Sequence, residues 1–462
     1  MIDLLTPLLK ERKTLLLGFG REGQSTFRFL KKHFPEHPVS IADRDPDLQA
    51  KAADLLTGQG PTLHLGENYL DSLKHYQLII KSPGVGLPED LQPAPGNLIT
   101  SQTQLVLQAY HRQIIGVTGT KGKSTTSSLI YHLLNTAGIP AALVGNIGRP
   151  PFDYLDNVSP TDRIVFEMSS HQLEDTMLAP RISVLLNLFP EHLDRYPSLE
   201  AYYSAKMRIL SGQLDDDIFI FNEDIPGIAG RIKEVNAKRA YYSFSSGLKV
   251  KNGCYISGSR IILCQEGRES VYVESTDHYP LKGDHNRMNM MAALLAARLA
   301  GASDDHIRQG LATFQGLEHR LEYVGEYRGI HFYNDSIATI PEATIAAVKA
   351  LPATDTLILG GYDRMLDYSG LIDFLVQSGV INFIFIGQAG GRMLEGFKAA
   401  GKPDKNLFWT DNLTIACEKA LEVTRKGKIC LLSPAAASYD QFKNFEERGN
   451  VFKKLVKGEQ FS

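Results

Sequence analysis

The sequence predicts an α/β protein of three domains, each built around a largely parallel sheet. Its 462 residues exceed what one hydrophobic core usually supports. Short apolar runs typical of buried strands alternate with helical patterns along most of the chain, which favours parallel sheets with crossover helices. A Pro- and Gly-rich stretch at 87–97, and a new α/β pattern beginning after 314–318, predict domains at 1–100, 101–315 and 316–462.

The first domain is predicted to open with a helix followed by a strand. Charges between two short apolar runs distinguish residues 1–20 from a signal peptide. Strand-like runs recur at 13–20, 38–43 and 76–83. Gly18, Gly20 and Gly23 form a GxGxxG turn after the first strand, and Asp43 lies near the end of the next. This pattern predicts a Rossmann-like domain. It leaves open a nicotinamide site, a plain tight turn, or a site for another phosphorylated nucleoside.

The central domain is predicted to contain a phosphate loop. A helix is expected at 98–110, and strand-like runs follow at 113–119, 163–170, 181–190 and 217–222. The stretch GVTGTKGKST at 116–125 offers converging N–H groups, a lysine for phosphate oxygens and a hydroxyl for Mg²⁺, ahead of a helix. Its glycines do not fit the usual GxxxxGK[ST] spacing, so an ordinary strand–turn–helix corner is the alternative. Gly-Lys-Ser-Thr at a strand–helix junction favours nucleotide phosphate binding.

Further polar residues follow the central strands. Glu167 ends one strand, where a carboxylate can hold Mg²⁺, cap a helix or face solvent. Asn187, His192 and Asp194 follow the next strand, at the sheet edge where ligands bind in open α/β sheets. A structural histidine is the alternative there. Lys206 lies in a helical segment, where the default is a solvated head on an amphipathic helix.

The apolar pattern changes near the end of the central domain. Residues 243–279 alternate apolar and polar residues around Asn-Gly and Ser-Gly turns, which predicts a small antiparallel insert. Residues 288–301 predict a buried helix with Gly301 as its cap. Asn286 and Asn289 are spaced to share one helical face, where their amides could read a nucleobase edge or cap the helix.

The third domain repeats the α/β pattern. Its strand-like runs lie at 331–336, 356–363, 381–387 and 428–434. Asp335 and Ser438 stand at strand ends, a position that suggests ligand contacts. Helix capping is the competing interpretation of both residues.

Composition excludes several classes of protein. Hydrophobic content of 43% and charged content of 22% are typical of globular domains, and the net charge of −3 gives no basic footprint for nucleic acid or an anionic membrane. Four cysteines are scattered without a CxxC pair, which argues against a disulfide framework or a zinc site and fits a reducing compartment. No run is long enough to span a bilayer. We therefore expect a soluble cytoplasmic protein.

Taken together, the motifs resemble the Mur ligase family of peptidoglycan synthesis. In chain order they are GVTGTKGKSTT, GNIG, EMSSHQLE, NLFPEHLDRYPS, AYYSAKMRIL, HNRMN, EHRLE, NDSIAT and SPAAASYDQFKNFEERG. The last is most similar to the D-glutamate-adding members of the family. The resemblance covers essentially the whole chain. It also accounts for the glycine spacing, because the family's loop reads TGT-x-GK-[ST], as at 118–124.

The resemblance implies an ATP-dependent amide ligase, acting as a monomer on small molecules. ATP would phosphorylate the free carboxylate of UDP-N-acetylmuramoyl-L-alanine, and the amine of D-glutamate would attack the acyl phosphate. The implied cofactors are ATP, Mg²⁺ (or Mn²⁺) and a carbamylated Lys206. The first domain would bind UDP rather than NAD. The third domain would close over ATP if it supplies nucleotide contacts.

The resemblance also assigns residues to sites. Catalytic roles fall on Lys123, His192 and Lys206. ATP contacts are Thr118, Gly119, Thr120, Lys121, Gly122, Lys123, Ser124, Thr125, Thr126, Asn286, Asn289, Arg320 and Asp335. Metal contacts are Ser124, Glu167, His192 and Lys206. UDP-substrate contacts are Gly20, Arg21, Glu22, Gly23, Asp43, Ser82, Asn146, Ser169 and Gln172, and D-glutamate contacts are Arg364, Ser438 and Phe445.

Two departures from the family pattern concern the amino-acid site. Ile337 stands where the family often has lysine, and an aliphatic side chain cannot pair with a carboxylate. Arg364 replaces the lysine expected after LGG. We therefore expect Arg364 to pair with the side-chain carboxylate of D-glutamate through two hydrogen bonds. The run Asp43-Arg44-Asp45 also differs from the family's usual residues around uracil.

Three other functions are compatible with parts of the sequence. A folylpolyglutamate-type ligase also adds glutamate, but the DQFKNFEERG ending and a full UDP-type domain argue against it. A nicotinamide-dependent dehydrogenase would use the GxGxxG turn and leave the loop around Lys123 unexplained. A nucleotide switch without catalysis would not need three α/β units.

Overall fold

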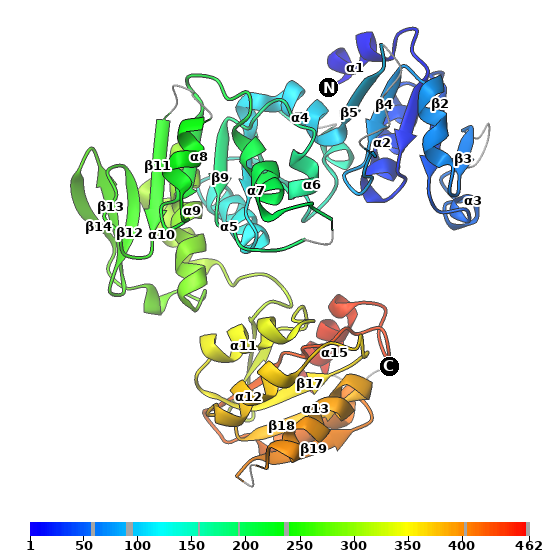
Figure 1. The fold of residues 1–462 in the computed structure, drawn as a ribbon. Coiled ribbons are helices and arrows are strands. Elements are labelled where there is room, and N and C mark those ends of the chain that lie inside the picture. The colour runs from blue at the N-terminus through cyan, green and yellow to red at the C-terminus, as the bar shows by residue number, and fades with distance from the viewer. Residues whose placement is uncertain are drawn as a thin grey trace. The chain divides into compact units, whose positions relative to one another are not determined.

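The computed structural model describes residues 1–56, 61–88, 96–155, 158–192, 195–234, 240–401 and 404–458. Its strands form three sheets. The chain divides into two compact units, one of residues 1–278 with 284–312 and the other of residues 279–283 with 313–462. The first unit holds two of the sheets and the second unit holds the third (Figure 1). Asp194 lies outside the described residues.

The first sheet is parallel throughout, in the order β3-β2-β1-β4-β5. Its strands are β1 (Thr14–Leu17), β2 (Val39–Asp43), β3 (Leu63–Leu65), β4 (Leu78–Lys81) and β5 (Leu98–Ser101), and its helices are α1 (Ile2–Leu9), α2 (Arg21–His33), α3 (Leu48–Lys51) and η1 (Tyr69–His75). The helix expected at 98–110 is partly wrong. Residues 98–101 pair with β4 as a strand, and the helix begins only at Gln102.

The central sheet has nine strands in the order β14-β13-β12-β11-β10-β9-β6-β8-β7. They are β6 (Ile114–Thr118), β7 (Ala141–Gly145), β8 (Arg163–Glu167), β9 (Ile182–Leu185), β10 (Ile218–Asn222), β11 (Ala240–Ser245), β12 (Gly253–Ser257), β13 (Arg260–Gln265) and β14 (Arg268–Val273). Strands β12, β13 and β14 pair antiparallel, as predicted for the insert, and the other pairings are parallel.

Helices of the central region surround this sheet. They are α4 (Gln102–Tyr110), η2 (His111–Gln113), α5 (Lys123–Thr136), η3 (Pro151–Asp153), α6 (Ser170–Leu173), α7 (Leu199–Met207), η5 (Arg208–Leu210), α8 (Ile228–Glu234), η6 (Thr276–His278), α9 (Asp284–Leu299) and α10 (Asp304–Thr313). The predicted buried helix is α9, which begins four residues early, and Gly301 after it has φ +108°. Helix α2 packs on η3, with the rings of Phe29 and Phe152 4.7 Å apart, so the first two sheets share a hydrophobic core.

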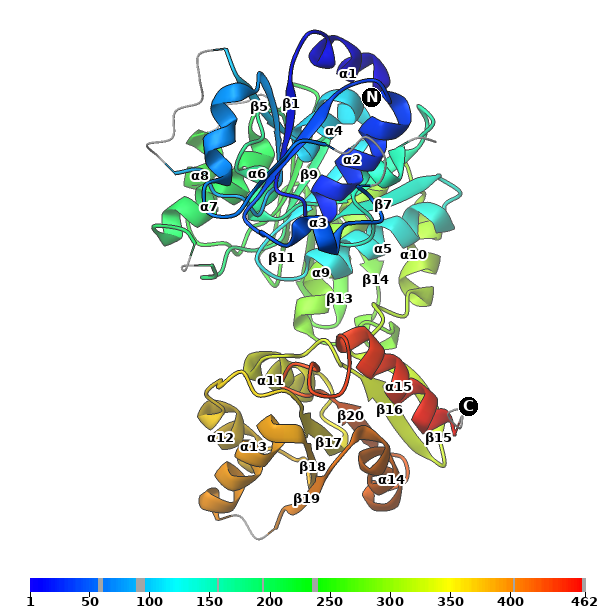
Figure 2. The same ribbon diagram turned by 90° about the vertical axis from the view of Figure 1, so that its right-hand side faces the viewer.

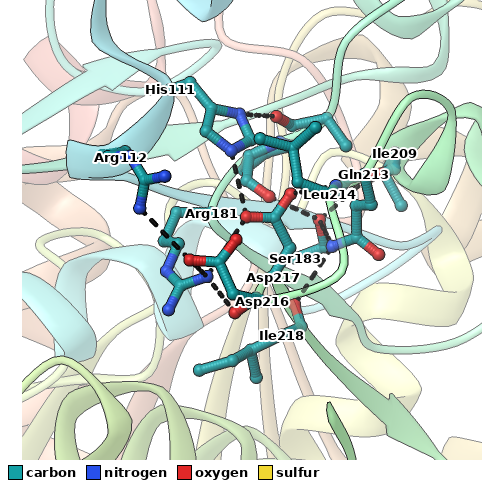
Figure 3. A network of polar contacts seen from close by, with 12 residues as sticks. His111, Arg112, Arg181, Ser183, Ile209, Gln213, Leu214, Asp216, Asp217 and Ile218 are labelled. Carbon is teal, nitrogen blue, oxygen red and sulfur yellow. Dashed lines mark hydrogen bonds and ion pairs between the residues drawn. The ribbon is translucent and has the colours of Figure 1, made fainter. Parts of the chain in front are cut away.

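The amino edge of the central sheet is held by a polar network around the buried Asp217 (Figure 3). Nε2 of His111 lies 3.0 Å from Oδ1 of Asp217, and Nδ1 of the same ring lies 2.8 Å from the carbonyl oxygen of Ala179. Arg181 adds ion pairs to Asp216 at 3.0 Å and to Asp217 at 3.4 Å. The hydrogen bond to Asp217 raises the pKa of His111 above its usual value.

The third sheet has the order β15-β16-β20-β17-β18-β19. Its strands are β15 (Glu322–Tyr327), β16 (Ile330–Asn334), β17 (Thr354–Gly360), β18 (Asn382–Ile386), β19 (Asn406–Thr410) and β20 (Ile429–Leu432), and only β15 pairs antiparallel. Helices α11 (Pro341–Ala350), α12 (Ser369–Gln377) and α13 (Gly387–Ala400) cover one face, and α14 (Leu413–Val423) and α15 (Phe445–Lys457) the other (Figure 2). Accordingly, Leu357 and Leu359 join one core and Ile358 the other.

The predicted α/β class with largely parallel sheets is confirmed. The domain boundaries at 100 and 315 stay predictions. Among the helices of the described residues, none has the length and apolar character that a membrane span requires.

Candidate functional site

The loop between β6 and α5 has the geometry of a phosphate cradle. Gly122 is the N-cap residue of α5 and has φ +86°, a conformation that favours glycine. A Cβ at this position would lie 2.4 Å from Oδ1 of Asn289, so the loop and α9 approach too closely for a side chain. Asn187 braces the loop, because its Oδ1 accepts from Lys121 N at 2.8 Å and its Nδ2 donates to Lys121 O at 2.9 Å. The loop leads directly into the N-terminus of α5, and helix N-termini bind anions.

Two lysines converge on the carbonyl oxygen of Gly119. Nζ of Lys123 donates to it at 2.9 Å and to the oxygen of Thr120 at 2.9 Å. Nζ of Lys206 donates to the same Gly119 oxygen at 3.0 Å and lies 4.8 Å from the ring centre of Tyr202. Burial, with the charge of Lys123 adding to it, lowers the pKa of Lys206 to about 7. Lys206 is only 2% exposed, so the solvated-head interpretation is wrong.

Glu167 presents an unsatisfied oxygen near this loop. It ends β8, next to β6 in the sheet, and is fully buried. Nδ2 of Asn146 donates to its Oε1 at 2.8 Å, whereas Oε2 has no hydrogen-bond partner. A buried carboxylate oxygen without a partner is costly unless a ligand or cation satisfies it. The surface-carboxylate interpretation of Glu167 is therefore wrong.

His192 follows the strand β9, and we call His192 together with Arg195 and Tyr196, which bond to its carbonyl oxygen, the His192 turn. Its φ is +57°, a strained value for a residue other than glycine, and its carbonyl oxygen accepts from Arg195 N at 3.1 Å and Tyr196 N at 3.0 Å. Its ring contacts the rings of Tyr202 and His171, with centres 5.8 and 5.4 Å apart. Nε2 of His171 is buried without a hydrogen-bond partner, and burial lowers the pKa of this histidine to about 4.

Some of the predicted metal contacts have the donor chemistry that a divalent cation needs. The described residues hold no group of three or more His, Cys, Asp and Glu side chains placed for a metal, so standard ligands alone do not complete a site. Glu167 nevertheless offers an orphan carboxylate oxygen. Ser124 is half-buried at the start of α5, and Lys206 would become an acidic ligand if carbamylated.

The GxGxxG turn of the first sheet forms a second cradle. A Cβ at Gly23 would lie 2.1 Å from Gly18 O, whereas one at Gly20 would meet nothing within 4 Å, which leaves space for a ligand above the turn. Both oxygens of Asp43 are used, one by Phe19 N at 2.7 Å and the other by Asp45 N at 2.9 Å. Asp43 therefore shapes the turn.

The second cradle is linked to the central region by polar contacts. Nε2 of Gln172 donates to Oε1 of Glu22 at 2.6 Å, and Oε1 of Gln172 accepts from Ser169 N at 2.9 Å. Ser169 and Gln172 form the capping box of α6, which follows β8 and Glu167. Burial raises the pKa of Glu22 to about 7, and its Oε2 has no partner. Nη2 of Arg21 donates to Gly148 O at 2.8 Å.

Other predicted nucleotide contacts have identifiable neighbours. Nδ2 of Asn289 donates to Oδ1 of Asn286 at 3.1 Å, and both residues are buried. Thr118 donates to Met168 O at 2.8 Å, and Tyr202 OH donates to Thr120 Oγ1 at 3.2 Å. These hydroxyl contacts fix the loop to neighbouring elements. Thr125 and Thr126 are buried in α5.

In the second unit, predicted residues gather at the carboxyl edge of the third sheet. Asp335 follows β16, where its oxygens accept from Ser433 Oγ at 2.8 Å and Leu321 N at 3.2 Å, and burial raises its pKa to about 7. Ser438 follows β20 and is buried. The capping interpretations of Asp335 and Ser438 are wrong, because α15 is capped by Asn444, and α11 begins after Ile340.

Arg364 lies on the loop after β17, and Phe445 is the first residue of α15. Nη2 of Arg364 donates to Thr339 O at 2.7 Å, which joins the loop after β17 to the NDSIAT loop. Phe445 begins α15, and its carbonyl oxygen accepts from Ser336 Oγ at 2.8 Å. Arg320 is exposed in the same unit.

Sequence reasoning missed several residues around these cradles. Tyr202, Tyr196 and His171 pack around His192, and Glu191 lies between Lys121 and His192. Arg195 reaches from the His192 turn to the first sheet. These residues lie within the quoted motifs, but the sequence did not single them out because most of their contacts join different motifs.

Known proteins match this chain over nearly its full length. Residues 117–297 match the Mur ligase middle domain. A UDP-N-acetylmuramoylalanine--D-glutamate ligase from Caldanaerobacter subterraneus is 36% identical, over 97% of this chain and 98% of the relative. A protein of the same name from Pelotomaculum thermopropionicum is 34% identical, over 96% of this chain and 97% of the relative.

Solved structures share the fold at lower identity. MurF ligase from Thermotoga maritima in complex with ADP has a TM-score of 0.56 and 17% identity, with all of both chains covered. UDP-N-acetylmuramate-alanine ligase MurC from Thermotoga maritima has a TM-score of 0.56 and 14% identity, over 97% of this chain and all of the other. These likenesses concern the arrangement of helices and strands.

Proposed function

This chain belongs to the UDP-N-acetylmuramoylalanine--D-glutamate ligases of the Mur ligase family, and from that premise we propose how its residues carry out the reaction. The resemblance in the sequence is confirmed by the curated relatives. The protein is an ATP-dependent ligase that adds D-glutamate to UDP-N-acetylmuramoyl-L-alanine in peptidoglycan synthesis. The assignment of residues to roles is our proposal.

The observation that carries the mechanism is the meeting of Lys123 and Lys206 at the Gly119 carbonyl, in a loop that heads α5. A carboxylate is a poor electrophile, so the free carboxylate of the sugar-nucleotide substrate must first be activated. A carboxylate oxygen attacks the γ-phosphorus of ATP, the bond to the β-phosphate oxygen breaks, and ADP leaves. Lys123 neutralises charge on the β- and γ-phosphates during this transfer, where two anions would otherwise repel each other.

Amide formation follows at the acyl phosphate. The neutral amine of D-glutamate attacks the acyl carbon, and the resulting tetrahedral centre loses inorganic phosphate and one proton to give the amide. Thr118–Thr126, Asn286 and Asn289 are the proposed nucleotide contacts of the first unit. Arg320 and Asp335 are the proposed nucleotide contacts from the second unit.

Mg²⁺ or Mn²⁺ would be held by Ser124, Glu167, His192 and a carbamylated Lys206, and would screen the phosphate and carboxylate charges. The orphan oxygen of Glu167 supports this assignment. A pKa of about 7 leaves a large neutral fraction of the Lys206 amine near neutral pH. That nitrogen can add to CO₂ and release a proton, which replaces a cation near Lys123 by an anion.

The sugar nucleotide is assigned to the first sheet and its neighbours. Gly20, Arg21, Glu22 and Gly23 would surround the diphosphate at the N-terminus of α2, with Asp43 shaping the turn and Ser82 beside it. Asn146, Ser169 and Gln172 would contact the muramoyl part. Arg364, Ser438 and Phe445 would bind D-glutamate.

A phosphate-release assay tests the function. Purified protein receives ATP, Mg²⁺ and UDP-N-acetylmuramoyl-L-alanine while the acceptor is varied between D-glutamate and L-glutamate. Folate replaces the sugar nucleotide in a parallel arm. We expect phosphate release only with the sugar nucleotide and D-glutamate together. ATP consumption that is unaffected by both substrates would refute the proposal.

A further inference from the structure

The GxGxxG turn and the His192 turn of the first unit are joined by a continuous series of contacts through Arg195. Nη1 of Arg195 donates to Gly84 O at 3.1 Å, and Nη2 donates to Pro83 O at 3.2 Å. One guanidinium group thereby holds two successive carbonyls of the loop after β4. The planar group has donors placed for such a paired contact, which a lysine ammonium cannot reproduce.

On the side of the first sheet, this loop carries the residue that supports the GxGxxG turn. Ser82 directly precedes Pro83, and its Oγ donates to Gly18 O at 2.9 Å. Lys81, one residue earlier, is 4% exposed and forms an ion pair with Asp175 at 2.7 Å. The end of β4 is therefore fastened to the region after α6 by a second contact. A ligand bound at the GxGxxG turn can therefore affect the loop after β4, which Arg195 contacts.

On the other side, Arg195 belongs to the His192 turn. Its backbone N–H closes that turn on the His192 carbonyl at 3.1 Å. The guanidinium group also lies 3.6 Å from Oε2 of Glu174, and the other oxygen of Glu174 accepts from Tyr196 OH. Because His192 has a strained positive φ, its conformation depends on such surrounding contacts.

We propose that Arg195 is a positioning residue that couples binding of the sugar nucleotide at the GxGxxG turn to the metal-binding orientation of His192. The inference rests on the proposed roles of Ser82 and His192. Occupation of the turn fixes the carbonyls of Pro83 and Gly84, the guanidinium group is held more firmly, and His192 is presented to the metal. Linkage requires the reverse effect as well, so the metal must tighten sugar-nucleotide binding by the same factor.

The test measures Mn²⁺ affinity by the electron paramagnetic resonance signal of the free ion, with and without UDP-N-acetylmuramoyl-L-alanine. For the unaltered protein we expect the substrate to tighten Mn²⁺ binding about fivefold or more. Arg195→Ala should lose most of this enhancement. Arg195→Lys keeps the charge but not the paired contact, and should lose it nearly as fully. Any direct contact between metal and substrate is common to all variants, so the difference reports the path through Arg195.

Arg28→Ala is the matched control. Arg28 also joins the first sheet region to the central region, through hydrogen bonds of 3.0 and 2.8 Å to Asp153, but it does not contact the His192 turn. It should keep the full enhancement. Thermal unfolding of each variant shows whether the fold is retained, and calorimetric titration of the substrate with and without Mn²⁺ checks that the coupling is reciprocal.

Each outcome bears on the proposal. Loss of coupling in Arg195→Ala with retention in Arg28→Ala supports it. Equal coupling in the unaltered protein and Arg195→Ala overturns it. Equal loss of coupling in both alanine variants also overturns it, because any contact between the first sheet and the central region would then produce the effect. If the unaltered protein releases phosphate with both substrates but shows no coupling, this inference fails while the proposed function stands.

Discussion

At the scale of single residues, burial changes the chemistry of groups that the sequence presents as ordinary. Lys206 is the clearest case, because desolvation and the neighbouring Lys123 lower its pKa to about 7. The amine is neutral above that pKa and protonated below it. Carbamylation requires the neutral amine, so its dependence on CO₂ must change with pH.

We predict that activity in CO₂-depleted buffer is restored by bicarbonate, with a lower half-saturating concentration of dissolved CO₂ at pH 8 than at pH 6. The fraction of neutral amine rises about tenfold for each pH unit below the pKa and levels off above it. Labelling with ¹³C-bicarbonate should give a carbamate resonance in the unaltered protein and none in Lys206→Ala. Bicarbonate-independent activity without that resonance would contradict the assignment.

Arg364 gives a second prediction at this scale. Its Nη2 donates to Thr339 O, and its side chain lies at the sheet edge assigned to the amino acid. Arg364→Ala should raise the KM for D-glutamate about 10- to 100-fold, the loss expected for a charge-assisted hydrogen bond, with little change in the KM for ATP. The KM of Arg364→Lys for D-glutamate should lie between the values of the unaltered protein and Arg364→Ala. Equal changes in both KM values would reject the assignment.

At the scale of elements, the close approach of the phosphate loop to α9 and the ion pairs at the amino edge of the central sheet hold loops and strand ends in place. Gly122 illustrates close approach, because φ +86° disfavours a side chain and a Cβ there would lie 2.4 Å from Oδ1 of Asn289, which would have to move. Gly138 is a natural comparison, since it has φ +70° and open space around its missing Cβ.

We therefore predict that Gly122→Ala abolishes measurable ATP binding and destabilises the protein by more than the about 1–2 kcal/mol that a left-handed residue costs alone. Gly138→Ala should lower the free energy of unfolding only by that conformational cost, and it should bind ATP normally. Urea unfolding and calorimetric titration measure the two effects. Equal destabilisation by both substitutions would show that the approach of α9 to the loop imposes no constraint.

The polar network at the amino edge of the central sheet predicts how stability depends on pH. The folded state raises the pKa of His111 through Asp217, so protonated His111 stabilises the fold. That contribution is fully present below the unfolded pKa, near the usual 6.5, and is lost as pH rises through the higher folded pKa.

His111→Gln, which keeps a hydrogen-bonding side chain without the titration, should cost about 1 kcal/mol at pH 5.5 and less at pH 8.5. Urea unfolding at both values, with the unaltered protein measured in parallel, provides the comparison. A destabilisation that grows with pH would show that the charge of His111 does not support the fold.

At the scale of the whole molecule, each unit contains hydrophobic clusters of its own among the described residues. The clusters of the third sheet contain only residues of the second unit, whereas the first two sheets share one core. We predict two calorimetric transitions. UDP, whose proposed site lies wholly in the first unit, should raise the midpoint of only one of them. A single transition that moves as a whole would contradict this independence.

Much of this organisation could be predicted from the sequence. Strand runs, the phosphate loop and the antiparallel insert follow from local patterns of apolar residues and turns, which act over a few neighbours. The strand at 98–101 escaped prediction because its identity depends on pairing with β4. The burial of Lys206 is invisible to helical periodicity, since it arises from Tyr202 and the loop around Gly119. Asn187 and Arg195 contact segments that are distant in the sequence, so the residues next to them in the chain do not indicate those contacts.

The shared carbonyl of Gly119 has one more consequence. Nζ of Lys123 holds its own loop in shape through the Gly119 and Thr120 oxygens. Phosphate oxygens that bind Lys123 would replace these main-chain acceptors, and the loop shape that the two contacts fix is already that of a phosphate cradle. Nucleotide capture by such a preformed ring of donors should be rapid and show only a small change in heat capacity.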